Sequence, residues 1–210
     1  MSNSIITAYP AFFIFATIMV ITPGPANLVL MSSGARFGFY KSIPFVIGVT
    51  FGKLFLTLGL GLGFLTLVYS NVLLLNAIKI LGIAYICWLS WKILFLTLDK
   101  NSSRDQVYAP SLTNGLLVHP LNPKAWAMII AAYTQFTSFG TSNAEISWLT
   151  EVTIVACTFF AIQAVSHSLW CWGGGLIFNF LVKKNILRQI VVTFLSFLTV
   201  GTVIYSNLII

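Results

Sequence analysis

The sequence predicts an all-α integral membrane protein whose six transmembrane helices form two inverted three-helix repeats. Of its 210 residues, 58% are hydrophobic and only 7% are charged, which is a composition typical of bilayer spans. Six apolar runs, each at least about 20 residues long, take up most of the chain. The first and fourth runs are each interrupted by two closely spaced prolines, so we expect helices 1 and 4 to be broken.

The six expected spans are separated by short polar segments. In chain order they cover residues 9–33, 42–69, 72–98, 112–136, 146–178 and 186–207. The longest polar stretch, residues 99–111, divides the chain into a first half of residues 1–98 and a second half of residues 112–210. Because the spans leave no room for a separate soluble domain, we expect residues 1–210 to form one transmembrane domain.

Basic residues lie in alternate loops between the expected spans. The three basic loops contain Arg36 and Lys41, then Lys100 and Arg104, then Lys183, Lys184 and Arg188. The other loops and both tails contain no Lys or Arg. The positive-inside rule therefore predicts that the three basic loops are cytoplasmic and that both termini lie outside. Since residues 1–8 are not basic, we expect no signal peptide.

Each half of the chain contains an odd number of spans. The first span therefore crosses the membrane in the opposite direction to the fourth. If the halves are structural repeats, they are inverted repeats, an arrangement common among secondary transporters.

The remaining composition argues against several other classes of protein. The basic residues behind the net charge of +7 are spread along the chain rather than gathered on one polar segment, so we expect no nucleic-acid partner. Cys87, Cys157 and Cys171 lie in apolar runs without CxxC spacing, so we expect neither disulfides nor a metal site. The pattern indicates no cofactor.

The paired prolines are the feature most informative about function. The sequence TPGP at residues 22–25 and the sequence PLNP at residues 120–123 should each unwind a helix. At 1.5 Å per residue, Pro23 and Pro123 lie roughly 20 Å and 17 Å into their spans, near mid-depth. Unwound backbone is tolerated there where it lines a cavity or packs against protein. Matching breaks in two halves point to a transporter binding site, and two structural kinks are the alternative.

Polar and basic residues accompany the breaks. A new half-helix begins after each break, and its free N–H groups favour an anion, with Asn27 and Asn122 beside them. Lys53 and Lys124 also lie near mid-depth, where no Asp or Glu occurs in any span. A bound carboxylate is one partner for these lysines; snorkelling, or contact with backbone carbonyls at the breaks, is the other interpretation. The residues expected to bind substrate are Thr22, Pro23, Gly24, Pro25, Asn27, Lys53, Asn122, Pro123 and Lys124.

The absence of acidic residues at mid-depth also bears on the substrate. A site for lysine or arginine would need an anion for the side chain, so a neutral amino acid suits this chain better. His167 in the fifth span and His119 before the second break are candidates for carrying a coupling proton. Interhelical hydrogen bonding is the alternative for His167, and it is the interpretation we favour for Ser166 on the same helix face.

Two further patterns predict contacts within the fold. Lys79 and Glu151 lie at similar depth and predict an ion pair. Glycines of the second span fall on one stripe that predicts close packing, either within the fold or across a dimer. Residues 173–175 predict the cytoplasmic end or a bend of the fifth span. The glycines of the stripe are Gly48, Gly52, Gly59 and Gly63.

Three segments together resemble a known family. They are TPGP followed by SSGARFGF at residues 32–39, NPKA at residues 122–125, and AYICWLSWK at residues 84–92. These segments resemble the LysE/RhtB family of amino-acid exporters, and the third is most similar to the cysteine/O-acetylserine branch. Homoserine, threonine and leucine exporters share the same motifs. The resemblance implies proton-driven efflux of amino acids or close derivatives across the bacterial inner membrane. We expect an amino-acid substrate and the lipid bilayer as partners, with a homodimer as one arrangement of the chain.

Two functions of other classes compete with transport. A membrane-embedded enzyme would need a nucleophile with a base or a metal cluster, and two histidines without mid-span carboxylates supply these poorly. A non-transporting membrane assembly protein would explain the hydrophobicity but not the paired breaks. The sequence therefore favours a secondary exporter that is not an enzyme.

Overall fold

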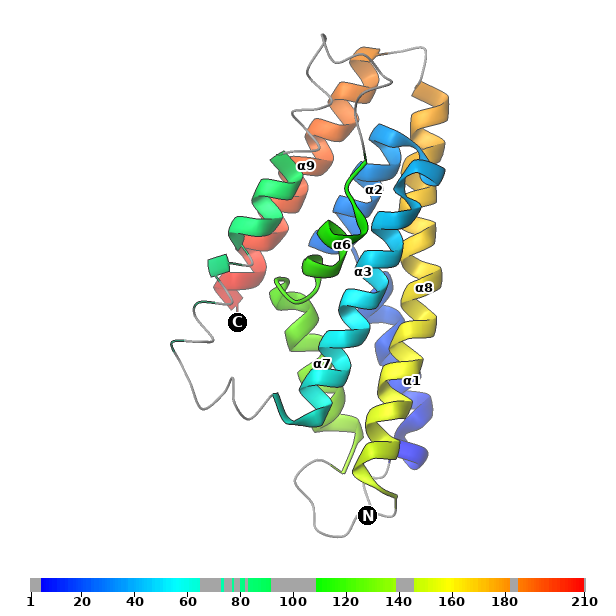
Figure 1. Ribbon diagram of the computed structural model, residues 1–210, viewed down its shortest axis with the longest axis vertical. Coiled ribbons are helices and arrows are strands. Elements are labelled where there is room, and N and C mark those ends of the chain that lie inside the picture. The colour runs from blue at the N-terminus through cyan, green and yellow to red at the C-terminus, as the bar shows by residue number, and fades with distance from the viewer. Residues whose placement is uncertain are drawn as a thin grey trace.

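All regular structure in the described part of the chain is helical (Figure 1). The computed structural model describes residues 5–64, 73, 77, 80–81, 83–91, 109–138, 146–181 and 185–209. Its helical elements are α1 (Ile5–Ile21), α2 (Pro25–Phe37), α3 (Phe39–Gly59), the π-helical turn η1 (Leu60–Phe64), α6 (Leu112–Val118), α7 (Pro123–Phe136), α8 (Trp148–Leu181) and α9 (Asn185–Ile209). The all-helical prediction is confirmed for these residues.

Two described helices are long and apolar enough to cross a membrane. They are Phe39–Gly63 and Trp148–Leu176, and the pair α1 and α2 makes a third if the two helices form one bent span. The angle between α1 and α2 is 49°. The predicted third span is described only at isolated positions and at residues 83–91, and most of the central polar loop lies outside the described residues.

The helix ends at both pairs of prolines follow from proline chemistry. The helix α1 ends at Ile21, and α2 begins at Pro25, where a residue without an N–H group loses no intrahelical hydrogen bond. In the same way, α6 ends at Val118 and α7 begins at Pro123. Pro10 and Pro44 lie inside α1 and α3, each as the sixth residue of its helix.

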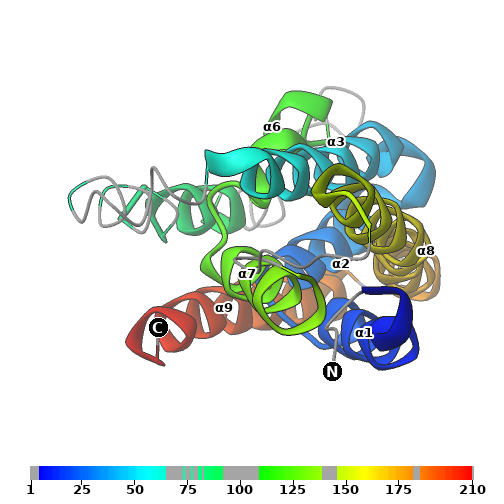
Figure 2. The ribbon, with the colours of Figure 1, turned by 90° about the horizontal axis from the view of Figure 1, so that it is seen from below.

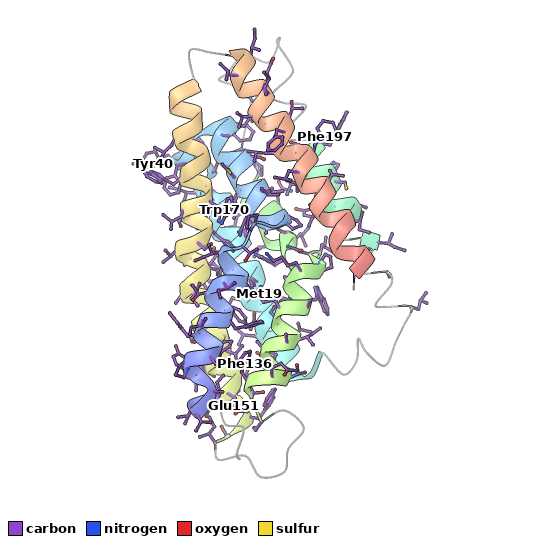
Figure 3. The ribbon with its side chains drawn as sticks, turned by 180° about the vertical axis from the view of Figure 1, so that it is seen from behind. Met19, Tyr40, Phe136, Glu151, Trp170 and Phe197 are labelled. Carbon is purple, nitrogen blue, oxygen red and sulfur yellow. The ribbon has the colours of Figure 1, made fainter. Side chains whose placement is uncertain are left out.

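The apolar core is divided into two clusters at the level of the two helix interruptions. Along the first interruption, Val20 belongs to one cluster and Ala26 to the other. Along the second, Ala125 belongs to the first cluster and Val118 to the other. Figure 3 shows the corresponding order along the bundle, with Phe136 toward one end and Met19 near the middle. The two clusters therefore meet where the helices are interrupted.

Small residues allow the central helix α2 to approach its neighbours closely. Figure 2 shows α2 inside the bundle, and it packs mainly against α8 and α9. A methyl group added at Gly34 would lie 1.9 Å from the Cys171 carbonyl oxygen, and one at Gly174 would lie 2.0 Å from the Met31 carbonyl oxygen. The helix α8 continues past residues 173–175, so the predicted helix end there is wrong.

The predicted glycine stripe has a packing role over half its length. Methyl groups at Gly48 and Gly52 would meet the backbone of α6, so α3 and α6 pack closely there. Methyl groups at Gly59 and Gly63 would meet no described atom within 4 Å, so close packing at these two positions stays a prediction. The contact is limited by the short length of α6, which ends at Val118.

Adjacent glycines of α8 provide a matched test of this packing. We expect Gly174→Ala to destabilise the protein by about 1–3 kcal/mol, because its methyl group overlaps backbone that cannot move away cheaply. Gly173→Ala should be neutral or stabilising, since a methyl group there meets nothing within 4 Å and alanine favours helix. Thermal unfolding in detergent would measure both, and equal midpoints would contradict the close α2–α8 contact.

Candidate functional site

The first interruption exposes backbone carbonyls that two side chains satisfy. The last carbonyls of a helix lack intrahelical partners. Asn27 Nδ2 donates to the carbonyl oxygens of Val20 at 2.9 Å and Thr22 at 3.1 Å. Lys124 Nζ donates to the carbonyl oxygens of Thr22 at 3.0 Å and Pro23 at 3.4 Å. The C-terminal end of α1 is therefore capped partly by a lysine that belongs to α7.

The second interruption is closed by its own residues. Asn122 Oδ1 accepts a hydrogen bond from the Lys124 N–H at 3.1 Å, and the Asn122 carbonyl accepts one from the Ala125 N–H at 2.9 Å. Trp126 Nε1 donates to the Pro120 carbonyl at 2.8 Å. The first N–H groups of α7 are thus engaged, so the prediction that they face an anion is wrong. By contrast, Gly24 gives α2 no side-chain cap.

Lys53 is a buried basic residue without a described acidic partner. Its side chain is 1% exposed, and its Nζ lies 3.6 Å from Met128 Sδ and 4.4 Å from the centroid of the Phe159 ring. Among the described residues no carboxylate pairs with it. Lys53 therefore does not snorkel, whereas Lys124 contacts backbone carbonyls as the alternative interpretation expected.

His119 and His167 form a stacked pair. Their ring centroids lie 5.2 Å apart, and the two Nε2 atoms are separated by 3.3 Å. His167 Nδ1 lies 3.1 Å from Thr50 Oγ1, which donates its proton to the Val46 carbonyl at 2.9 Å. Since the Thr50 hydroxyl has one proton, it accepts from the His167 Nδ1–H.

The Thr50 contact determines the protons of the whole pair when both rings are neutral. His167 Nε2 is then an acceptor, and His119 Nε2–H donates to it. His119 Nδ1 is left as a proton acceptor, and this buried atom has no hydrogen-bond partner in the described part of the chain. The pair therefore has one open position for a further proton.

The neighbouring polar residues of α8 differ in their contacts. Gln163 Nε2 donates to the Thr50 carbonyl at 3.0 Å, which is an interhelical hydrogen bond. Ser166 Oγ is buried and has no hydrogen-bond partner among the residues described, so the interhelical hydrogen bond predicted for Ser166 is wrong.

A small cavity joins these groups. Its volume is about 20 Å³, enough for about one water molecule and too small for an amino acid. Figure 3 shows one lining residue, Met19, near the middle of the bundle. The lining residues are Met19, Val20, Gly24, Ala26, Asn27, Lys53, His119, Asn122, Lys124, Ala125, Met128 and His167.

The structure brings together most residues singled out from the sequence. Those that line the cavity are Gly24, Asn27, Lys53, Asn122, Lys124, His119 and His167. Thr22 and Pro23 contact Lys124 through their carbonyls, while Pro25 and Pro123 only begin their helices. Sequence reasoning missed Met128 and Thr50. Thr50 is three residues before Lys53 on α3, a spacing that could have placed it on the same face.

Glu151 lies away from this cavity. Its predicted partner, Lys79, is outside the described residues. The buried Glu151 carboxylate accepts hydrogen bonds from the Ile5 N–H at 3.2 Å, the Ser138 N–H at 3.0 Å and the Ser138 hydroxyl at 2.6 Å. Glu151 therefore holds α1, the end of α7 and α8 together at one end of the bundle (Figure 3). In the described part of the chain, no His, Cys, Asp and Glu cluster could hold a metal ion.

The fold and the site define an apolar, all-helical membrane protein with a polar cavity between two interrupted helices. The chain belongs to the LysE family, because the family described as LysE type translocator matches residues 17–206. The family resemblance of the sequence motifs is thus confirmed.

Similar proteins come from several bacteria. A leucine efflux protein of Enterobacter sp. (strain 638) is 28% identical over 91% of this chain and 88% of its own length. A cysteine/O-acetylserine efflux protein of Escherichia coli O157:H7 is 25% identical over 81% of this chain and 84% of its own length. An uncharacterized membrane protein of Bacillus subtilis (strain 168) is 30% identical over 71% of this chain and 78% of its own length. No solved structure gives a significant match.

The capping role of Asn27 can be tested by stability. We expect Asn27→Leu to lower the free energy of unfolding by about 1–3 kcal/mol, because it leaves the buried Val20 carbonyl without its side-chain donor. Thr17→Val is a control on the preceding helix, since Thr17 Oγ1 also donates to a carbonyl, that of Phe13, but at an exposed position. Thermal unfolding in detergent would compare them, and equal effects would contradict a capping role for Asn27.

Proposed function

We propose that the chain is a secondary-active exporter of neutral amino acids or close derivatives, driven by the proton gradient. The observation that carries the proposal is the cavity between the two interrupted helices, which two lysine side chains and several apolar side chains line together. The family and the efflux proteins among its relatives support this function. Their names span leucine and the cysteine/O-acetylserine pair, all of which have neutral side chains.

The proposal includes six spans arranged as two inverted repeats, residues 1–98 and 112–210. The pair α1 and α2 runs in the opposite direction to the pair α6 and α7 (Figure 1), which supports inversion. The α2–α3 junction, the C-terminal end of α8 and the N-terminal end of α9 lie toward the same end of the bundle (Figure 1), and each is next to basic residues in the sequence. We assign that end to the cytoplasm and both termini to the outer side of the bacterial inner membrane.

The substrate carboxylate binds beside the lysines in this proposal. Lys53 and Lys124 supply positive charge, and the N-terminus of α2, which has no side-chain cap, adds its positive dipole end. Lys53 lies at a depth where an unpaired charged lysine costs about 2.5–3.5 kcal/mol, so a bound carboxylate would favour its charged form. The substrate side chain faces Met19, Val20 and Met128, which suit an uncharged group.

Transport requires the bundle to open, because the cavity is too small for an amino acid. The two core clusters meet at the helix interruptions, so one half of each broken pair can tilt while its own cluster stays packed. Movement of the halves around a fixed central site is the general basis of alternating access.

Proton coupling is assigned to the histidine pair. The open acceptor, His119 Nδ1, can take a proton. The contact between the two rings then couples this protonation to His167, and the contact of His167 with Thr50 couples it to α3. The charged groups lining the same cavity are Lys53 and Lys124. A proton on His119 would add a third positive charge, so protonation and occupancy by substrate affect each other.

An efflux measurement tests the function directly. Cells loaded with dipeptides of leucine, cysteine or threonine release the amino acids internally, and efflux is compared with and without the gene. We expect faster efflux of at least one neutral amino acid when the gene is present. Unchanged efflux for all neutral amino acids would overturn the exporter proposal.

Lys124→Ala should lower the efflux rate by about tenfold or more, the change expected from losing one charge-assisted contact to the substrate. Lys41→Ala is the matched control, because Lys41 is exposed on α3, far in sequence from the interruptions. Membrane abundance of each variant is measured in parallel. Wild-type efflux by Lys124→Ala at equal abundance would show that Lys124 does not bind the carboxylate.

His167→Asn should uncouple transport from the proton gradient. Asparagine keeps a donor for Thr50 but does not titrate near neutral pH. In proteoliposomes, we expect the variant to lose efflux driven by a pH difference while exchange of labelled for unlabelled amino acid at equal pH continues. A variant that responds to the pH difference like the wild type would remove His167 from the coupling mechanism.

A further inference from the structure

We propose that the carbonyl oxygens of Thr22 and Pro23 form the subsite for the α-ammonium group of the substrate, and that Lys124 exchanges with this group. In the structure the Lys124 ammonium occupies the subsite. When substrate binds, its ammonium takes over the two carbonyls, and the released Lys124 ammonium pairs with the substrate carboxylate. This inference rests on the proposed function and gives the second charged group of the substrate, its ammonium, a binding position.

The chemistry of the subsite matches a primary ammonium. The carbonyls of Thr22 and Pro23 follow the C-terminal end of α1, where the helix dipole is negative and favours a cation. Lysine and an α-amino acid present the same group, an ammonium with three donors and no acceptor. The contacts of Lys124 Nζ, at 3.0 Å and 3.4 Å, show that an ammonium fits against both oxygens.

The Lys124 contacts can be exchanged without opening the end of α1. Thr22 and Pro23 are exposed, and Lys124 is only partly buried. Asn27, whose side chain is 5% exposed, donates both to the Val20 carbonyl, two residues before Thr22, and to the Thr22 carbonyl itself. Asn27 therefore maintains the helix end while the outer carbonyls change partners.

Gly24 provides the path along which Lys124 reaches the carbonyls. A methyl group at Gly24 would lie 3.0 Å from Lys124 Cδ and 3.1 Å from its Nζ, so the lysine side chain lies directly across this glycine. After exchange, the Lys124 ammonium needs to move only to the adjacent atoms of the substrate. In an α-amino acid the ammonium and carboxylate share one carbon, so both contacts form together.

The exchange predicts a specific pattern of recognition. An amine without a carboxylate can displace Lys124 but leaves its ammonium without a new partner. A carboxylic acid without an amine cannot replace Lys124 on the carbonyls at all. Only a zwitterion satisfies the two carbonyls and the lysine at once, so the wild type should bind both partial analogues weakly.

Binding to the purified full-length protein in nanodiscs tests this pattern. The probes are the neutral amino acid that the wild type exports best, its decarboxylated amine and its deaminated acid, which for leucine are 3-methylbutylamine and 4-methylpentanoate. The variant is Lys124→Met, which removes the Lys124 ammonium from the Thr22 and Pro23 carbonyls. The control is Lys53→Met, because Lys53 also lines the cavity but does not contact either carbonyl. All measurements are made in sodium and again in choline buffer.

We expect Lys124→Met to bind the amine about tenfold more tightly than the wild type does, because the amine gains one charge-assisted contact. We expect the same variant to bind the amino acid more weakly than the wild type does. This gain for the amine should exceed that of Lys53→Met, and a misfolded protein could not produce it.

Three outcomes would contradict the proposal. If the amino acid is exported and bound, but Lys124→Met does not bind the amine more tightly than Lys53→Met does, the subsite is wrong while the exporter function stands. A gain seen only without sodium would assign the carbonyls to a metal cation and overturn the ammonium assignment. If no neutral amino acid is exported, the proposed function itself fails.

Discussion

The backbone carbonyls left unpaired at the end of α1 are the constraint on which the site depends. In a membrane-spanning segment such groups cannot rely on bulk water, so each needs a donor from the protein or a ligand. Asn27 supplies one donor group from within the same helix pair. Lys124 supplies the other from α7, which means that the second interruption completes the first.

The cavity follows from this arrangement. Placing Lys124 over the α1 carbonyls brings the start of α7 against the end of α1, and the two apolar clusters separate at that level. Polar groups of α3 and α8 then gather at the boundary, where Lys53 and His167 both line the space. Basic residues therefore gather at the boundary between the two clusters, where the apolar core of the bundle is not continuous.

Much of the local structure could be predicted from the sequence, whereas contacts between helices could not. Proline spacing indicated where α1 and α6 end, because a missing N–H group and a ring clash act locally. The meeting of Lys53, Met128 and Phe159 depends on how three helices are rotated against one another, which apolar periodicity does not fix. The described donors to Glu151 could not be predicted, because backbone N–H groups leave no trace in residue identity, while its predicted partner Lys79 lies outside the described residues.

Asn27 and Asn122 show how similar residues at the two interruptions take opposite roles. Asn122 precedes the proline that begins α7, so it is the N-cap residue, and its oxygen accepts from the first turn. Asn27 lies two residues after the proline that begins α2, so its amide nitrogen reaches back to α1. The second interruption is therefore closed locally, while the first depends on a cation from the other half. Any movement that separates α7 from α1 must move Lys124 off the Thr22 and Pro23 carbonyls, and a ligand ammonium that replaces it removes that restraint. In the proposed exchange, substrate binding and separation of the halves would therefore be linked through one side chain.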